Sequence, residues 1–279
     1  MPTDRELARK SLIYRRELLR IIKHAGAGHT GGSLSCVDII GVLYNRILGV
    51  TPANAADPDR NRYVQSKGHS VEALYVVLTD MGFFPRPLLD TLGAAGSHLV
   101  GHPTRKVPGV EHNTGALGHG LPVAVGMALA AKLRKSAFRT FVLVGDGELA
   151  EGSNWEAAMA ASHHRLDNLT AIVDCNSLQI SGRTSAVMNS EPIDEKFAAF
   201  GWAVRKVSGH DIAALTSALE APLAPGRPGV VIASTVKGKG VSFMEDAAAW
   251  HHGVPDESQY LRALAEIDLK LAQLEEAPR

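Results

Sequence analysis

Apolar residues follow two patterns along this chain: stretches spaced as in helices, and short runs in which nearly every position is apolar. The helical spacing predicts helices over residues 4–25, 37–48, 71–81, 123–135, 155–164, 212–219 and 258–276. The short apolar runs predict strands over residues 62–66, 140–145, 169–176, 203–207 and 229–235. Because such strands alternating with helices are typical of a covered sheet, we predict an α/β fold: a parallel β-sheet flanked by helices on both faces.

The segments between these elements are rich in glycine, and none of them indicates a domain boundary. The first helix has clear end signals, since Thr3 and Glu6 form a capping box and Gly26 is a typical stop. Residues 26–35 are predicted to be a glycine-rich loop, and residues 85–122 irregular backbone. Because no repeat, low-complexity segment or linker divides the chain, we predict a single domain over residues 1–279.

Composition narrows the class of protein without choosing a function. The 29 basic and 29 acidic side chains cancel, which gives no electrostatic case for binding nucleic acid or an anionic membrane surface. An apolar content of 45% excludes intrinsic disorder. Two cysteines, Cys36 and Cys175, are too few for a disulfide framework. Because the first residues lack a secretory signal, we expect a soluble, cytoplasmic protein with no nucleic-acid or membrane partner.

The most informative segment is V-L-V-G-D-G-E, which ends one predicted strand, followed by Asn176 at the end of the next. Neighbouring parallel strands end at the same edge of a sheet, so Asp146 and Asn176 should converge there. A carboxylate, an amide oxygen and the carbonyl of Leu178 would suit Mg²⁺. Gly145 and Gly147 allow close backbone approach, and the Gly147 amide could donate to a phosphate. The alternative is a tight turn in which Asp146 only caps the backbone locally.

The helix after this segment has its own expected role. A second capping box is predicted from Ser153 to Glu156, and the N-terminal end of that helix would suit an anion. No other phosphate-binding motif competes, because neither G-x-x-x-x-G-K-[ST] nor G-x-G-x-x-G stands between a strand and a helix. The G-D-G segment is therefore the main candidate for a phosphate site.

G-D-G followed about thirty residues later by asparagine is similar to the thiamine diphosphate signature. Other segments resemble transketolases specifically: AGHTGGSLS, SKGHS, GHPTRKVPGVEHNTGALGHGLPVAVGMA, GDGELAEGSNWEA and TVKGKGVSFMEDAAAWHHG. They occur in the family's order over nearly the whole chain. The resemblance implies the diphosphate-binding domain of the thiamine diphosphate-binding fold, with thiamine diphosphate and Mg²⁺, or alternatively Ca²⁺, as cofactors.

The resemblance also implies catalytic histidines. His29 matches the family histidine that lines the substrate channel, and His102 matches the one that faces the hydroxyl groups of the donor sugar. His252 falls where the family touches the reacting substrate, although the adjacent His251 leaves open which of the two has this role. Histidines with near-neutral pKa values can move protons as the ketose bond breaks and re-forms.

Cofactor binding is implied for a larger set of residues spread over the chain. His69 and Lys237 match diphosphate contacts, and Glu151 matches a glutamate at the subunit interface that links two active sites. The implied metal ligands are Asp146, Asn176 and Leu178. The full implied cofactor set is His69, Gly115, Leu117, Gly145, Asp146, Gly147, Glu151, Asn176, Lys237 and His252.

Plainer interpretations exist for several of these histidines. His69 could simply cap the following helix, and His29 and His102 could be surface residues in glycine-rich loops. A zinc site formed by His98 and His102 is disfavoured, because the glycine and proline beside His102 keep the pair off one helical face.

Whole transketolases are more than twice as long and carry a second domain, which binds the pyrimidine ring and supplies the activating glutamate. The residues after Gly253 cannot hold such a domain, so we expect the N-terminal subunit of a split transketolase. Its partner would be a C-terminal subunit, in an α2β2 heterotetramer in which the two copies of this chain associate with each other. The expected reaction transfers a two-carbon ketol unit from a ketose phosphate to an aldose. Alternatives are part of a 1-deoxyxylulose-phosphate synthase-like enzyme, a transketolase for a specialised sugar, or a non-catalytic scaffold.

Overall fold

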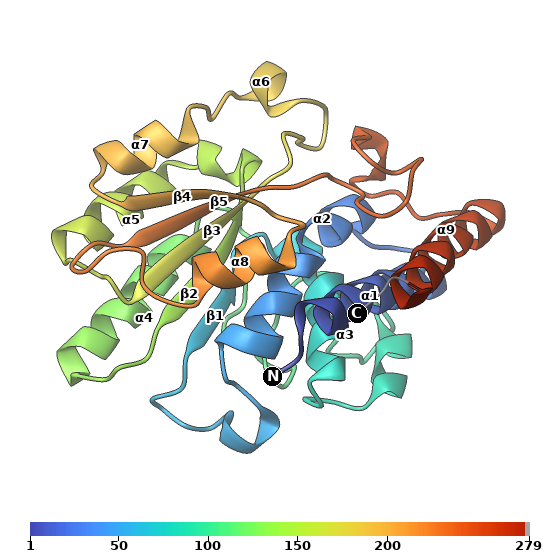
Figure 1. The fold of residues 1–279 in the computed structure, drawn as a ribbon, viewed down its shortest axis with the longest axis horizontal. Coiled ribbons are helices and arrows are strands. Elements are labelled where there is room, and N and C mark those ends of the chain that lie inside the picture. The colour runs from blue at the N-terminus through green and yellow to red at the C-terminus, as the bar shows by residue number, and fades with distance from the viewer. Residues whose placement is uncertain (277–279) are drawn as a thin grey trace.

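A parallel sheet of five strands lies at the centre of the computed structural model, which describes residues 1–276 (Figure 1). Its strand order is β1-β2-β3-β5-β4, and every neighbouring pair is parallel. The strands are β1 Arg62–Gln65, β2 Thr140–Gly145, β3 Leu169–Cys175, β4 Ala203–Ser208 and β5 Gly229–Ser234. All five predicted strands are confirmed, and only their terminal residues differ.

Helices cover both faces of this sheet, as the continuous apolar strands predict. Along β2, Phe141 and Leu143 belong to a core shared with α1, α2, α3, α8 and α9, whereas Val142 and Val144 belong to a core shared with α4, α5 and α7. This alternation follows from the period of two along a strand. The helices are α1 Asp4–Ala25, α2 Thr30–Val42, α3 Val71–Asp80, α4 Gly120–Arg134, α5 Gly152–His163, α6 Thr184–Val187, α7 Ile193–Ala199, α8 Ile212–Leu219 and α9 Glu257–Glu276.

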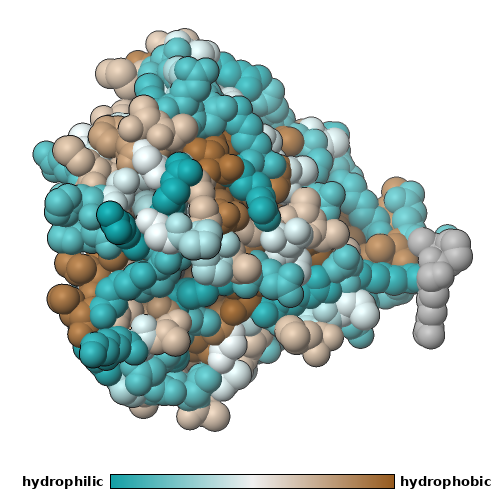
Figure 2. Space-filling model, turned by 60° about the vertical axis from the view of Figure 1, so that its left-hand side comes forward, coloured by the Kyte–Doolittle hydropathy of each residue, from teal (hydrophilic) through white to brown (hydrophobic). Residues whose placement is uncertain are grey.

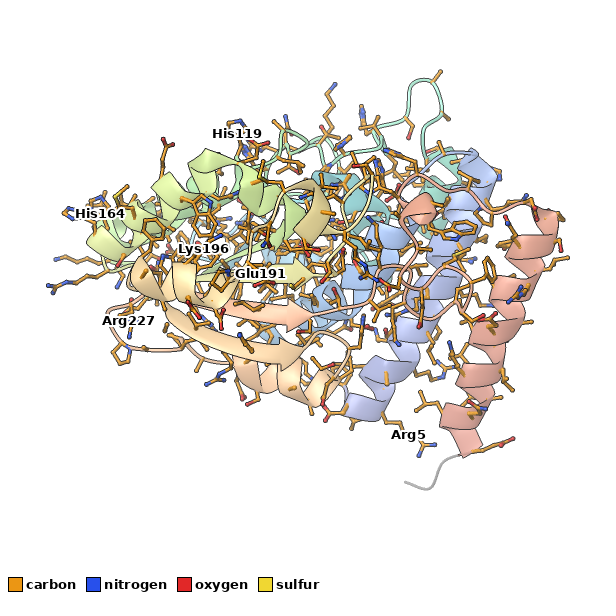
Figure 3. The ribbon with its side chains drawn as sticks, turned by 90° about the horizontal axis from the view of Figure 1, so that it is seen from above. Arg5, His119, His164, Glu191, Lys196 and Arg227 are labelled. Carbon is orange, nitrogen blue, oxygen red and sulfur yellow. The ribbon has the colours of Figure 1, made fainter. Side chains whose placement is uncertain are left out.

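The first helix has the ends that the sequence predicts. In the capping box, the amide of Glu6 donates to Thr3 Oγ1 at 3.2 Å and the amide of Thr3 donates to Glu6 Oε2 at 2.7 Å. Gly26 ends α1 in a left-handed conformation with φ 66°. Arg5 joins α1 to the end of α9 by donating to the carbonyl oxygen of Leu274 at 2.7 Å (Figure 3). Within residues 1–276, none of the helices combines the length and the apolar character needed to cross a membrane.

The prediction of a glycine-rich loop over residues 26–35 is wrong, because α2 already begins at Thr30 and includes Gly31 and Gly32. Every residue of α2 is buried, and the carboxylate of Glu72 from α3 accepts the amide of His29 at 3.1 Å, just before the helix. Tertiary packing and an acceptor from another helix therefore outweigh the weak helix propensity of glycine. The helix α7 was also not predicted, and α4 begins at Gly120, three residues earlier than expected.

The register of the sheet brings the candidate residues to one edge. Gly145, the last residue of β2, pairs with Asp174 near the end of β3. The chain leaves both strands on the same side, so Asp146 and Asn176 emerge next to each other. The spatial convergence expected from the sequence is therefore confirmed.

Candidate active site

A cavity of about 610 Å³ opens at this edge of the sheet. Its lining brings together segments that are far apart in the sequence: the start of α2, the loop after β1, the turn after β2, the loop after β3 and the segment before α9. Every residue predicted to have a catalytic, cofactor or metal role lines it. These are His29, His69, His102, Gly115, Leu117, Gly145, Asp146, Gly147, Glu151, Asn176, Leu178, Lys237 and His252.

Oxygen donors gather at one end of this cavity. The carboxylate of Asp146 is 3% exposed and accepts the amides of Gly147 at 2.8 Å and Ser177 at 2.6 Å. Beside it, the side-chain oxygen of Asn176 accepts the amide of Leu178 at 3.1 Å. Burial, reinforced by the charge of Asp174, raises the pKa of Asp146 to about 6. A divalent cation would relieve this buried carboxylate, and the donor set suits Mg²⁺ or Ca²⁺.

Two expectations about the turn after β2 can be compared with the structure, and the second of them is wrong. The Gly147 amide, expected to face a phosphate, donates to the Asp146 carboxylate in this structure. The predicted capping box from Ser153 to Glu156 is wrong, because α5 begins at Gly152 with Glu151 at its N-cap. The hydroxyl of Ser153 instead donates to the carbonyl oxygen of Gly118 at 2.8 Å, which joins α5 to the loop before α4.

Lys67, which lines the cavity, forms a buried ion pair with Asp174 that the sequence did not indicate. Lys67 is 2% exposed and Asp174 is fully buried. Burial alone would lower the pKa of Lys67, but the charge of Asp174 outweighs it and raises that pKa. Asp174 also accepts the hydroxyls of Ser35 and Thr235, so the loop after β1, α2 and the end of β5 all meet at this carboxylate.

Glu148 is a second buried carboxylate that the sequence did not single out. Its side chain accepts the amides of Gly118 at 2.8 Å and Gly145 at 3.1 Å, together with the hydroxyl of Ser66. These contacts fix the loop before α4 against the turn after β2. Glu148 therefore shapes the cavity wall between the two segments. The only local signal was its place in the G-D-G-E segment.

Five histidines converge at the other end of the cavity. The ring of His29 lies 4.0 Å from that of His252, 5.3 Å from that of His69 and 6.1 Å from that of His102. Burial and the neighbouring His252 and His102 lower the pKa of His29 to about 4, so its imidazole is neutral at pH 7. Burial, followed by the charge of Lys237, lowers the pKa of His251 to about 3. Neutral rings at this distance can accept or relay protons.

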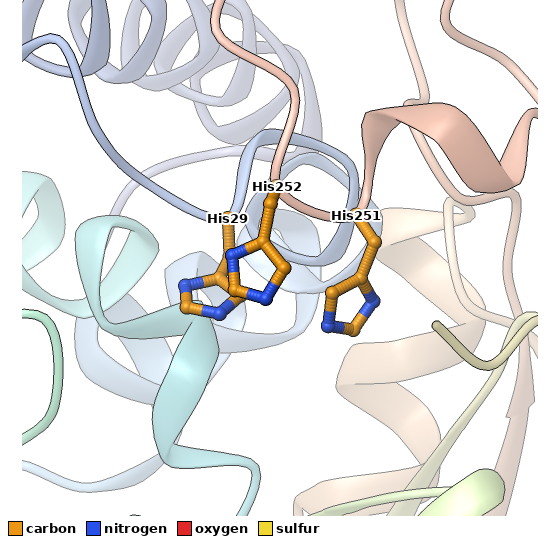
Figure 4. A group of neighbouring side chains, drawn as sticks. All are labelled: His29, His251 and His252. Atoms are coloured by element: carbon orange, nitrogen blue, oxygen red, sulfur yellow. The ribbon is translucent and has the colours of Figure 1, made fainter. Parts of the chain in front are cut away.

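The structure favours none of the plainer interpretations of these histidines. His69 forms no capping hydrogen bond to the following helix, and its side chain lines the cavity instead. His29 is half-buried and lines the cavity, whereas His102 is exposed, as that alternative supposes, but also lines the cavity. Among residues 1–276, the histidine nitrogens grouped closely enough to share a metal belong to His29, His251 and His252, within 4.8 Å of one another, and not to His98 (Figure 4).

Lys237 provides a positive charge between the two ends of the cavity. Its side chain is 2% exposed, and its ammonium group lies 2.9 Å from His251 Nδ1 and 3.5 Å from the carbonyl oxygen of Leu178. Burial, followed by the nearby charge of Lys67, lowers the pKa of Lys237 to about 8. Within residues 1–276 no carboxylate pairs with it, so this buried ammonium is suited to receive an anion.

The remaining predicted residues define the wall and the rim. Gly115 has a φ of 145°, and a Cβ atom there would lie 3.1 Å from the ring of His102, so glycine lets this histidine pack closely. Leu117 and Ile180 are 38% and 66% exposed although they line the cavity. Glu151 is exposed at the start of α5. The cavity therefore has an open, partly apolar rim.

Comparisons with known proteins agree with the sequence patterns. A family model described as "Transketolase, thiamine diphosphate binding domain" matches residues 10–267. The chain is 49% identical over 262 residues to one of the subunits of the apulose-4-phosphate transketolase of Phocaeicola vulgatus, covering 94% of this chain and 93% of that protein. It is 41% identical over 265 residues to the 6-deoxy-6-sulfo-D-fructose transketolase subunit SqwG of a Clostridium species, covering 94% and 96%.

Solved structures show the same fold within longer chains. A transketolase from Leishmania mexicana superposes with a TM-score of 0.83 at 28% identity, covering 99% of this chain and 46% of that one. The transketolase of Pichia stipitis in complex with sedoheptulose-7-phosphate gives a TM-score of 0.85 at 26% identity, covering 97% and 44%. The chain thus spans less than half the length of these two proteins, but nearly all of the two subunit relatives.

Proposed function

Because the chain belongs to the transketolase family, we propose that it is the N-terminal subunit of a two-chain transketolase that moves a two-carbon ketol unit from a ketose phosphate to an aldose. The observation that carries this proposal is the cavity, where all of the family's motif residues in this chain meet. The coverage of its relatives supports the split, since the chain spans 93% of a relative named as a transketolase subunit and 46% of a solved transketolase. The pyrimidine-binding domain would then lie on the partner chain.

The oxygen-rich end of the cavity fits a metal and a diphosphate. Asp146, Asn176 and the carbonyl of Leu178 would hold the cation, and His69 and Lys237 would contact the phosphates. The buried Asp146 lacks a cation and the buried Lys237 lacks an anion within residues 1–276, so a metal diphosphate would satisfy both. When bound, thiamine diphosphate supplies the carbanion chemistry that the protein side chains lack.

The histidine-rich end would bind and protonate the sugar. His29, His102 and His252 line the cavity away from the oxygen donors, and the ring of His29 lies 4.0 Å from that of His252. Because burial and these neighbours keep His29 neutral at pH 7, its ring can take a proton from a donor hydroxyl group and return it to the acceptor. Among residues 1–276, His29 Nδ1 is buried and has no hydrogen-bond partner, which leaves this nitrogen available to a ligand.

A partner chain would complete the site from its open side. Leu117 and Ile180 expose apolar side chains at the cavity rim, where a pyrimidine-binding subunit would cover them. On another side of the molecule, Leu133 of α4 and Met159 of α5 are 77% and 57% exposed, and Figure 2 shows apolar patches among polar residues in this region. This surface supports self-association through α4 and α5, with Glu151 nearby, as expected for an α2β2 heterotetramer.

A specialised sugar is the favoured substrate class. The subunit relatives described above carry names that refer to apulose-4-phosphate and to 6-deoxy-6-sulfo-D-fructose. We therefore propose a modified ketose as donor in place of the common pentose phosphates. A phosphorylated or sulfonated end would lie away from His29 and His251, because their neutral rings carry little positive charge at pH 7.

The test mixes the purified chain with the protein that contains the missing domain and supplies thiamine diphosphate and Mg²⁺. A panel of donors, including xylulose-5-phosphate, apulose-4-phosphate and 6-deoxy-6-sulfo-D-fructose, is offered with glyceraldehyde-3-phosphate as acceptor. Ketol transfer in the mixture, with the highest kcat/KM for a modified ketose, is the expected result. Absence of ketol transfer from every donor, in a mixture shown to bind the cofactor, would contradict the transketolase assignment.

A further inference from the structure

The tandem histidines His251 and His252 face different partners. The ring of His252 lies 4.0 Å from that of His29, towards the part of the cavity that also contains His102. His251 instead stacks on His69, with ring centres 5.4 Å apart and an interplanar angle of 26°. Figure 4 shows the ring of His252 next to that of His29, with the ring of His251 to one side of both. The two neighbouring imidazoles therefore make different contacts within one cluster of histidines.

The contact of His251 with Lys237 fixes the role of each atom. An ammonium group can only donate, so His251 Nδ1, at 2.9 Å from Lys237 Nζ, accepts. The proton of the neutral ring is then on Nε2. Burial and the positive charge of Lys237 lower the pKa of His251 to about 3, which keeps the ring neutral and able to accept at pH 7.

Within the described residues 1–276, Lys237 has one other acceptor within reach, and it belongs to a predicted metal ligand. The carbonyl oxygen of Leu178 lies 3.5 Å from Lys237 Nζ, at the outer limit of a hydrogen bond. Lys67 cannot substitute for Lys237, because its charge is already neutralised by Asp174. Without His251, the ammonium of Lys237 would be free to donate fully to the Leu178 oxygen and compete with a cation for it.

We propose that His251 is a positioning residue, which holds the ammonium of Lys237 away from the Leu178 carbonyl and in place for a phosphate, while His252 takes the role at the sugar. This inference rests on the proposed function, since it assigns Lys237 to the cofactor. His251, the first histidine of the W-H-H-G segment, thus gives this chain a dedicated acceptor for its cofactor lysine. The side-chain oxygen of asparagine can take the place of Nδ1, whereas leucine offers no acceptor.

The contact itself can be tested on the cofactor-free full-length chain. Long-range ¹H–¹⁵N NMR of the histidine rings reports which nitrogen carries the proton. The expected result is an Nε2–H tautomer for His251 at pH 7, whose Nδ1 resonance changes in the Lys237→Met variant. The proposal would be overturned by a proton on Nδ1 of His251, or by His251 ring resonances that do not change in the Lys237→Met variant. Either result counts whether or not ketol transfer is observed.

The consequence is tested by calorimetry with thiamine diphosphate and Mg²⁺ on the chain mixed with its partner. His251→Leu should weaken cofactor binding about tenfold or more, which is the loss expected for a hydrogen bond to a charged group. The same variant should lower kcat at saturating cofactor by a smaller factor. His251→Asn should restore affinity to within about threefold of the unaltered protein. His252→Leu should instead lower kcat without a matching loss of cofactor affinity. His164→Asn, altered outside the cavity, serves as the control.

Two results at this stage would refute the positioning role. One is a His251→Leu variant that binds the cofactor as tightly as the control. The other is a His251→Asn variant that binds no better than His251→Leu, because the ring would then matter for its shape and not as an acceptor. Calorimetry measures cofactor binding directly, so these results do not depend on transketolase activity. Failure of the proposed activity would instead appear as normal cofactor binding without turnover.

Discussion

Removing Lys67 should destabilise the chain strongly, because its partner cannot be reached by water. Lys67 is 2% exposed and Asp174 is fully buried, so Lys67→Met leaves an uncompensated carboxylate in the core. Breaking a buried pair in this way costs about 3–5 kcal/mol. The hydroxyls of Ser35 and Thr235 still donate to Asp174, which favours the lower part of that range.

The matched comparison removes both charges. Asp174→Asn alone leaves a buried ammonium and should cost a similar amount, whereas the Lys67→Met and Asp174→Asn double variant buries no charge. We expect the double variant to lose less stability than the summed losses of the two single variants, with a coupling energy of about 2–3 kcal/mol. The exposed pair of Arg9 and Glu275, 3.1 Å apart, provides a control, since Arg9→Met should change stability by less than about 1 kcal/mol.

Urea denaturation of the cofactor-free chain, followed by tryptophan fluorescence, measures these free energies of unfolding. The fully buried Trp202 should report loss of the core that packs against α5 and α7. A loss below about 1 kcal/mol for Lys67→Met would refute the buried-pair argument. Strict additivity in the double-mutant cycle would refute it as well, because independent sites show no coupling.

Two other features give predictions with different readouts. The pKa of Asp146 is raised to about 6 in the folded cofactor-free chain, so the folded state binds this proton more tightly than the unfolded state does. The free energy of unfolding should therefore fall as pH rises from about 4 through 6. Cofactor binding needs the charged form, so calorimetry should show affinity falling about tenfold per unit below pH 6, and a flat profile would contradict this. Gly120→Ala should lower the free energy of unfolding by about 1–3 kcal/mol, because the added Cβ would lie 2.7 Å from the Cα of Ser66. Gly126→Ala in the same helix meets nothing within 4 Å and should stabilise by about 0.5–1 kcal/mol in thermal unfolding; equal effects at both sites would contradict the packing argument.

The sheet and the position of the main candidate site residues could be predicted from sequence because their signals are local. The apolar runs of β2 and β3 identify the strands, and the rule that parallel strands end at one edge brings Asp146 to Asn176 without knowledge of any contact. The histidines and Lys237 were identified only by their match to family motifs, because they lie in segments whose apolar residues follow no regular pattern. All of these residues line the cavity.

The features that were not predicted depend on contacts between distant residues. Gly31 and Gly32 are weak helix formers, and only complete burial of α2, with Glu72 placed at its start, makes them helical. Lys67 and Asp174 are 107 positions apart, and nothing in either local segment indicates that they pair. Likewise, the different partners of the adjacent His251 and His252 follow from packing and not from spacing.

The most direct test of the central claim is a titration of this chain with its proposed partner while the rate of ketol transfer is recorded at saturating thiamine diphosphate and Mg²⁺. We predict no turnover with either chain alone, a rate that saturates at equal amounts of the two chains, and at least about a hundredfold loss with Asp146→Ala. Full turnover by this chain alone would contradict the split site. Undiminished activity of Asp146→Ala would contradict the placement of the metal diphosphate in this cavity.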